Sequence, residues 1–222
     1  MDSNPSLHDR GAEEPRCERE HMLSGRLYDA SDPELAGLRV KAHELCRRFN
    51  ASGEEDRDLR EDLLGQLIPD RGQDSDFMGP IYFDYGVFTT LGSRIFANFN
   101  FTVLDTCPVV IGDDVMIGPN VTLATPLHPM RWQERNLRRK PDGSLYDWEY
   151  GAPITIGANC WIASNVVICG GVTVGEGSVI GAGSVVTHDI PENSLAVGNP
   201  CMVLRTITEA ERMDLPEPCR PL

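Results

Sequence analysis

The chain has 222 residues, and its 34 Asp and Glu residues against 20 Lys and Arg residues give a formal net charge of −14. This balance argues against binding to nucleic acids or anionic membranes, because no basic surplus is available to neutralise phosphates. No apolar stretch approaches the roughly 18 residues of a membrane-spanning helix, and the polar N-terminus does not resemble a secretory signal. The seven cysteines form no Cys-x-x-Cys pair, so we expect reduced thiols and a cytoplasmic location.

The N-terminal part of the chain is predicted to be helical after a polar start. Residues 1–20 are polar and charged and are expected to be disordered. Between Leu35 and Phe49 apolar residues recur every three or four positions, as on one face of an amphipathic helix, with Pro33 near its first turn. A second helix is expected over residues 53–67, with Ser52 as its candidate cap, before Pro69 breaks the chain. Residues 21–76 are therefore predicted to form a helical N-terminal cap.

Residues 77–207 contain a repeat of six residues. An aliphatic residue opens every unit in the most regular part: Ile156, Ile162, Ile168, Val174, Ile180 and Val186. A period of six fits neither a helix nor a plain strand, but it fits a solenoid that turns a corner once per unit. Three units would make one triangular coil of about 18 residues, with Gly, Asn and Asp at the corners. The pattern therefore predicts a mainly β fold, a parallel β-helix.

Two features interrupt this repeat. Leu91, Ala97 and Val103 keep the six-residue step, as do Ile111, Ile117 and Leu123, but a short insertion near residues 106–109 separates these two sets. Residues 125–153 are polar, hold Trp132, Tyr146 and Trp148, and cannot fit within a coil. We expect them to form a long protruding loop, and such loops are usually functional. A short helix near residues 209–213 is expected in the C-terminal tail, residues 208–222.

His128, at the start of the long loop, is the candidate catalytic residue. An imidazole accepts a proton near neutral pH, as acyl transfer to a hydroxyl requires, although a loop histidine is often only a solvated side chain. The chain has no Gly-x-Ser-x-Gly elbow and no Cys–His signature, which favours direct attack without a covalent intermediate. Zinc is not expected, because only His128 and His188 lie in the repeat region, whereas a site of this kind uses about three imidazoles.

Each of the other polar residues could have either a functional role or a structural one. Asn98 could contact a ligand or simply occupy a corner, and Asp84 and Asp105 could hold sugar hydroxyls or be solvated carboxylates. The cations of the long loop could contact a phosphate or form a solvated face; they are Arg131, Arg135, Arg138, Arg139 and Lys140.

A set of short motifs extends from about residue 27 to residue 207. They lie at residues 27–35, 83–86, 97–100, 104–105, 117–121, 128–129, 153–157, 161–162, 179–186, 189–191 and 198–200. Among them are Phe83-Asp-Tyr-Gly86, Ala97-Asn-Phe-Asn100, His128-Pro129 and Gly198-Asn-Pro200. Together these motifs resemble the maltose and galactoside O-acetyltransferases, which are hexapeptide-repeat acyltransferases.

The resemblance implies a left-handed β-helix that assembles as a homotrimer, with active sites between subunits. It implies acetyl-CoA as donor and a sugar or similar small hydroxylated molecule as acceptor, without a metal, a nucleic-acid partner or a membrane partner. His128 matches the catalytic base, Asn98 matches a residue near the thioester, and Glu149 falls where a carboxylate steadies the histidine. Acceptor contacts are implied for Asp29, Asp32, Asp84, Asp105, Thr106 and Trp161. Coenzyme contacts are implied for Asn98, Ser164, Ala182, Thr187, His188 and Arg205.

The chain departs from the family pattern at three positions. His188 stands where the family often has Lys, and Met202 stands where it often has Arg, so one phosphate contact is expected to be lost. Thr106 replaces a second acidic residue of the galactoside enzyme, which puts galactoside specificity in doubt. Two alternatives stay open: the same scaffold acting on an antibiotic hydroxyl or on serine, and a non-catalytic β-helix that serves as a binding or assembly module.

Overall fold

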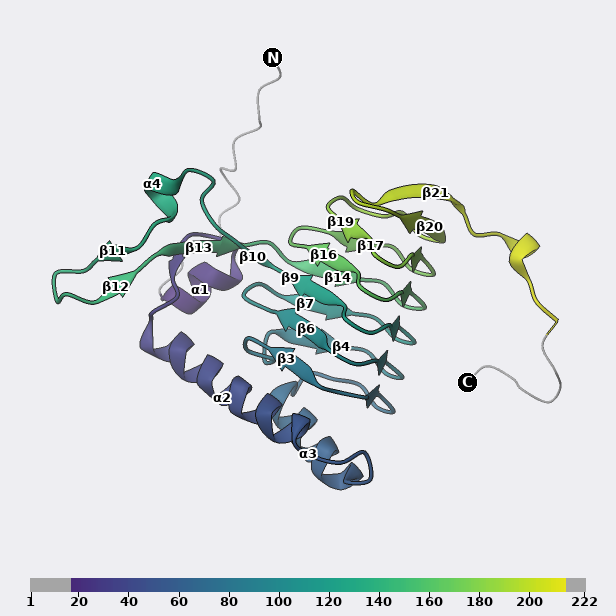
Figure 1. The fold of residues 1–222 in the computed structure, drawn as a ribbon, viewed down its shortest axis with the longest axis horizontal. Helices are drawn as coiled ribbons and strands as arrows, with labels where there is room; N and C mark the ends of the chain where they lie inside the picture. Colours follow the sequence, from purple (N-terminus) through teal and green to yellow (C-terminus); the bar gives the residue numbers. More distant parts are fainter. Residues whose placement is uncertain (1–16, 215–222) are drawn as a thin grey trace, which may run out of the picture.

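The computed structural model describes residues 17–214, and most of them form a stack of triangular coils (Figure 1). Three parallel sheets make the faces of this left-handed β-helix. The four-stranded sheet contains β4 (Thr89–Leu91), β7 (Val109–Ile111), β14 (Ile154–Ile156) and β17 (Thr173–Val174). The five-stranded sheet contains β3 (Ile81–Phe83), β6 (Phe101–Leu104), β9 (Thr122–Ala124), β16 (Val167–Cys169) and β19 (Val185–Val186). The seven-stranded sheet contains β2 (Asp76–Phe77), β5 (Phe96–Ala97), β8 (Met116–Ile117), β15 (Trp161–Ile162), β18 (Val179–Ile180), β20 (Ser194–Val197) and the antiparallel β21 (Met202–Thr206).

The predicted aliphatic positions fill the interior of the stack. The residues that open the six-residue units from 156 to 186 are all at most 1% exposed. Their side chains stack because strands one coil apart pair in parallel register, as Ile162 does with Ile117 and Ile180. One corner is turned by Asn100, Asn120 and Asn165, each with φ near +60°, as expected of asparagine at a turn.

The coil length differs from the prediction in the first half of the stack. Strands pair with residues 20 positions later before the long loop, as Thr89 does with Val109, and 18 positions later in the coil after it, as Thr155 does with Thr173. In the last coil the spacing is 16, as between Val179 and Leu195. The extra residues fall at one corner, where the chain passes from the five-stranded to the four-stranded sheet. We call this corner the insertion edge; it comprises residues 84–88, 105–108, 125–153, 170–172 and 187–189. The long loop therefore leaves the stack where its coils are already enlarged.

Three helices precede the coils: α2 and α3 pack at the β3 end of the stack, whereas α1 lies beside β1 (Tyr28–Asp29) and β13 (Trp148–Gly151) (Figure 1). They are α1 (Glu18–Leu23), α2 (Pro33–Asn50) and α3 (Arg57–Leu67). The prediction of disorder is wrong for the end of its range, because α1 begins at Glu18; residues 1–16 lie outside the described residues. Ser52 is not the cap of α3, since its hydroxyl donates to the Phe49 carbonyl and α3 begins only at Arg57.

The long loop is built of short regular pieces and projects from the stack on the side of α1 (Figure 1). They are β10 (Pro126–Leu127), α4 (Trp132–Arg135), β11 (Arg138–Arg139), β12 (Leu145–Tyr146) and β13 (Trp148–Gly151). The predicted short helix in the tail is a single 3₁₀ turn, η1 (Glu209–Glu211), with a capping box from Thr208. None of the helices within residues 17–214 combines the length and the apolar character that crossing a bilayer requires.

Candidate functional site

The long loop returns to the stack through a small antiparallel sheet that aligns three functional side chains. Strand β13 lies between β10 and β1 (Tyr28–Asp29). Glu149 pairs with Tyr28 on one side, and Tyr150 pairs with Leu127 on the other. His128 follows Leu127 directly, so continuation of this antiparallel register places it opposite Glu149. Tyr28, Glu149 and His128 therefore form one row across the sheet.

His128 is accompanied by two carboxylates. One ring nitrogen of His128 and one oxygen each of Asp147 and Glu149 all lie within 4.8 Å of one another. Asp147 and Glu149 are two residues apart on an extended segment, so their side chains share one face. His128 is exposed and both acids are partly buried. Asp147 was not predicted from the sequence, and its alternation with Glu149 is the signal that could have found it.

Glu149 is held from its other side by Tyr28. The Tyr28 hydroxyl donates to Glu149 Oε2 at 2.7 Å, and burial together with this carboxylate raises the pKa of Tyr28 well above its ordinary value. The phenol therefore stays protonated and remains a donor. Three such side chains could also ligate a cation, but exposed acidic groups are often this close without one. Because Glu149 is already bound by Tyr28, we interpret the group as a histidine supported by carboxylates.

Asp84 belongs to the same region of the insertion edge. Its side chain is 25% exposed, and its Oδ1 lies 3.9 Å from Nε2 of His43 on α2. Burial raises the pKa of Asp84. The charges of His43 and Arg39 oppose this rise, whereas the charge of Glu149 adds to it. Asp84 is thus close enough to Glu149 for their charges to interact, and it is accessible to a ligand.

Asp105 and Thr106 occupy the same edge, but their side chains are 0% and 4% exposed. Asp105 Oδ1 accepts from the Tyr85 N–H at 2.8 Å, and Oδ2 accepts from the Thr89 hydroxyl at 3.0 Å. Burial raises the pKa of Asp105 to about 6, although these hydrogen bonds oppose the rise. The Thr106 and Thr125 hydroxyls share a 3.0 Å hydrogen bond. Both side chains are used to close the enlarged corner, so an acceptor contact by Asp105 or Thr106 stays a prediction.

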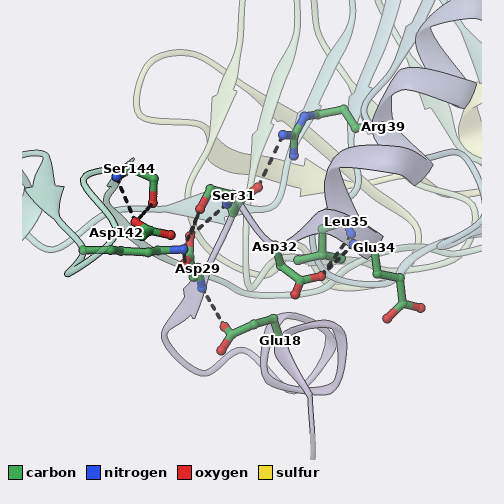
Figure 2. Close-up of polar contacts among 11 residues, drawn as sticks. Glu18, Asp29, Ser31, Asp32, Glu34, Leu35, Arg39, Asp142 and Ser144 are labelled. Carbon is green, nitrogen blue, oxygen red and sulfur yellow. Dashed lines mark hydrogen bonds and ion pairs between the residues drawn. The ribbon is translucent and has the colours of Figure 1, made fainter.

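Asp29 and Asp32 also make structural contacts (Figure 2). Asp29 is 9% exposed, accepts from Ser31 and forms an ion pair with Lys140 of the long loop. Burial alone would raise the pKa of Asp29, but hydrogen bonds from Lys140 and Ser31 lower it overall. Asp32 caps α2 by accepting from the N–H groups of Glu34 and Leu35. Both carboxylates thus help to hold the N-terminal segment in place, Asp29 also ties it to the long loop, and an acceptor contact by either stays a prediction.

A second group of predicted residues lies at the corner between the seven-stranded and five-stranded sheets. Asn98 follows β5 there, and Ser164 and Ala182 follow β15 and β18 one coil apart. Asn98 Oδ1 accepts from the Phe99 N–H at 2.7 Å, which leaves its Nδ2 available. Within residues 17–214 the N–H groups of Ser164 and Ala182 have no acceptor, whereas their neighbours Ala163 and Gly181 donate to the next coil. A row of free donors therefore follows this corner.

The remaining predicted residues are exposed and spread over two regions. Trp161 lies on the outer face of β15 and is 51% exposed. Thr187 and His188 lie at the insertion edge and share a 2.9 Å hydrogen bond. Arg205 on β21 is paired with Glu211. A single chain thus brings His128, Glu149 and Asp84 together, but it keeps Asn98, Ser164 and Ala182 on a different corner.

The loop cations are engaged locally. Arg135 donates to the Met130 carbonyl, Arg138 to the Gln133 carbonyl and Arg139 to the Gly143 carbonyl. They stabilise the conformation of the loop, which supports the interpretation of a structural, solvated face.

Comparisons with known proteins show which proteins the chain is similar to. Family models match residues 21–72 (maltose acetyltransferase hexapeptide capping motif), 108–127 (hexapeptide repeat of succinyl-transferase) and 153–188 (bacterial transferase hexapeptide, six repeats). The chain is 40% identical over 193 residues to galactoside O-acetyltransferase of Escherichia coli (strain K12), which covers 87% of this chain and 91% of that protein.

Two solved structures are similar along nearly their whole length. A maltose O-acetyltransferase from Clostridium difficile 630 has a TM-score of 0.79 and 44% identity, covering 87% of this chain and 98% of that chain. A galactoside acetyltransferase in complex with coenzyme A has a TM-score of 0.77 and 39% identity, covering 87% of this chain and 92% of that chain.

Proposed function

Since the chain belongs to the maltose and galactoside O-acetyltransferases of the hexapeptide-repeat acyltransferases, an acetyl-CoA-dependent family, we propose that it transfers acetyl to a hydroxyl of a sugar with His128 as general base. The row formed by Tyr28, Glu149 and His128 is the observation that carries this proposal. It provides a proton acceptor whose carboxylate partner is itself fixed by a buried hydroxyl.

The proposed reaction is a direct attack. The acceptor oxygen bonds to the thioester carbonyl carbon while its proton passes to the His128 imidazole. Glu149 steadies the imidazolium that results, and Asp147 adds a second negative charge beside it. The C–S bond then breaks, and coenzyme A leaves as its thiol with the proton returned by the imidazole. The free N–H of Ser164 supports a role in stabilising the oxyanion, a contribution that is typically worth about 3 kcal/mol.

We further propose that the working enzyme is a homotrimer. His128 and the free donors of Ser164 and Ala182 lie on different corners of one chain, so pairing corners of two subunits would complete each site. Asn98, Thr187, His188 and Arg205 are then assigned to the thioester and coenzyme side, and Asp84 and Trp161 to the acceptor side. No metal takes part in this mechanism. Location in the cytoplasm stays a prediction.

The test is an acetyl-transfer assay that follows coenzyme A release from acetyl-CoA. We expect turnover with maltose, glucose or galactosides, and mass spectrometry should find one added acetyl group on a hydroxyl of the product. Turnover only with serine or with a hydroxylated antibiotic would replace the sugar assignment. Absence of transfer to every acceptor, together with absence of acetyl-CoA binding, would favour a non-catalytic module.

A further inference from the structure

Lys140 of the long loop binds the N-terminal segment at two side chains. Its ammonium group forms an ion pair with the Asp29 carboxylate and donates to the Ser31 hydroxyl at 3.0 Å. The side chains of this ion pair are 31% and 12% exposed, so salt and water screen it less than a fully exposed pair. Asp29 is itself fixed, because its Oδ1 accepts from the Ser31 N–H at 2.9 Å and from the Ser31 hydroxyl at 2.7 Å (Figure 2). We call the contacts of Lys140 with Asp29 and Ser31 the loop clasp.

The turn that carries Lys140 is ordered by hydrogen bonds of its own. Strands β11 and β12 form a hairpin, and the Lys140 N–H donates to the Ser144 carbonyl at 2.9 Å across its turn. Asp142 Oδ1 accepts from the Ser144 N–H at 2.9 Å and from the Ser144 hydroxyl at 2.7 Å (Figure 2). Because the turn is held in this way, the loop clasp ties the whole hairpin to the N-terminal segment.

Asp147 is the single residue between β12 and β13, and the loop clasp reaches both of its neighbours. On one side, the Lys140 ammonium lies 5.4 Å from the centroid of the Tyr146 ring, which is a cation–π distance. On the other side, Trp148 pairs with Asp29 across β13 and β1. The rings of Tyr146 and Trp148 also meet edge to face, with centroids 5.4 Å apart. The backbone on both sides of Asp147 is therefore held by the clasp.

Asp147 itself faces the proposed base. Side chains alternate along an extended segment, so the two aromatic rings lie on the face opposite to Asp147 and Glu149. These two carboxylates lie with His128 inside the 4.8 Å group described above. The Tyr28 hydroxyl fixes Glu149, whereas within residues 17–214 no hydrogen bond or ion pair fixes the Asp147 carboxylate. The place of Asp147 thus depends on how its neighbours are held.

We propose that Lys140 is a positioning residue for the reaction: through the loop clasp it holds the Asp147 carboxylate beside the His128 imidazole. The interaction between two charges weakens with distance, so Asp147 stabilises the imidazolium only while it stays close to the ring. Without Lys140 the hairpin loses its tie to Asp29, and Tyr146 loses the cation that covers it. The proposal rests on the proposed acetyl transfer with His128 as base, and it adds to that mechanism a residue that touches neither substrate.

The first experiment measures kcat and KM for three substitutions at residue 140. Lys140→Met keeps the apolar stem and removes the charge; we expect kcat to fall about tenfold with KM for acetyl-CoA unchanged, since misplacing a group by about 1 Å can cost up to about 100-fold. Lys140→Arg should retain at least about half of kcat, because a guanidinium also pairs with a carboxylate. Lys140→Gln, which still donates to Ser31, should show an intermediate loss and serves if Lys140→Met does not fold. Lys41→Met, at the other lysine of the chain, exposed on α2, is the matched control.

A double-mutant cycle separates positioning from a general structural role. In an Asp147→Asn background, Lys140→Met should lower kcat by less than about twofold, because the charge that the clasp positions is gone. An equal loss in both backgrounds would overturn the proposal. Near-normal kcat in Lys140→Met would overturn it too, and would leave the proposed function intact.

Amide hydrogen exchange gives a readout that does not need activity. Residues 138–147 should exchange faster in Lys140→Met than in wild type, whereas Lys41→Met should match wild type. If no sugar is acetylated, the proposed function fails, and exchange still decides whether Lys140 holds this segment: faster exchange in Lys140→Met supports it, and unchanged exchange rejects it.

Discussion

The Tyr28 hydroxyl donates a 2.7 Å hydrogen bond to Glu149 Oε2 and so joins two residues that lie 121 positions apart in the chain. Strand β1 brings Tyr28 to one side of β13, and β10 brings His128 to the other side. Tyr28 is 1% exposed, so its hydroxyl cannot exchange Glu149 for water. The N-terminal segment therefore takes part in positioning the carboxylate beside the proposed base.

Tyr28→Phe tests this relationship. A hydrogen bond to a charged group is worth about 1.5–3 kcal/mol, so we expect kcat to fall about tenfold. In a Glu149→Gln background, Tyr28→Phe should lower kcat by less than about threefold, because the charged acceptor is gone. Tyr150→Phe, on the same strand as Glu149, is the matched control and should leave kcat unchanged. An equal loss from Tyr28→Phe in both backgrounds would show that Tyr28 does not act through Glu149.

His128→Ala tests the base. We expect kcat to fall about 10²–10⁴-fold, the usual contribution of a general base, while calorimetry shows unchanged acetyl-CoA affinity. His21→Ala on α1 is the control and should retain full activity. Near-normal kcat in His128→Ala would remove His128 from the mechanism.

The buried carboxyl of Asp105 should make stability depend on pH. Burial raises its pKa from an ordinary value near 3.8 to about 6, so between these pH values the folded chain binds more protons than the unfolded chain. The contribution of this group therefore favours folding at low pH and is lost as pH rises through about 6. Relative to wild type, Asp105→Asn should become more stable by about 2 kcal/mol between pH 4 and pH 7.

Urea unfolding of wild type and Asp105→Asn at both pH values, at equal protein concentration, measures this difference. Asp76→Asn, at an exposed carboxylate, serves as the control and should follow wild type. A constant difference between Asp105→Asn and wild type across the range would mean that the pKa of Asp105 is the same in the folded and the unfolded chain.

A positive charge added to β21 should tighten acetyl-CoA binding when it lies on one face of the strand, and do so less on the other face. Met202 is 61% exposed and stands where a phosphate-binding Arg is expected, so Met202→Arg should tighten acetyl-CoA binding by about tenfold or less, and high salt should reduce the gain. Val203→Arg adds the same charge on the opposite face of the strand and should change affinity less. Arg205→Ala should weaken binding. Calorimetry that finds no change in Met202→Arg and in Arg205→Ala would place the coenzyme elsewhere.

Assembly gives the fifth prediction. Light scattering should give a mass near three times 24.5 kDa. If each site joins two corners from different subunits, mixed trimers of His128→Ala and Asn98→Ala chains should regain activity, since random mixing leaves about a quarter of the sites intact. A monomeric protein with full activity would refute the shared site.

The sequence alone determined the coils, because a period of six with inward aliphatic residues leaves few other ways to bury Ile156, Ile162 and Ile168. It also located the long loop and His128 at its start, since a polar segment of that length cannot fit in a coil. It did not predict the 20-residue coils, whose extra residues look like ordinary turn residues until strand pairing shows that they share one edge.

The tertiary structure decided the roles of the carboxylates. Glu149 and Asp105 are both acidic residues near strands, and nothing local distinguishes them. Pairing of β1 with β13 gives Glu149 a buried hydroxyl and places it beside His128, whereas the enlarged corner buries Asp105 against Tyr85 and Thr89. These contacts join residues far apart in the chain, and burial and hydrogen bonding at that range depend on how strands pair in space.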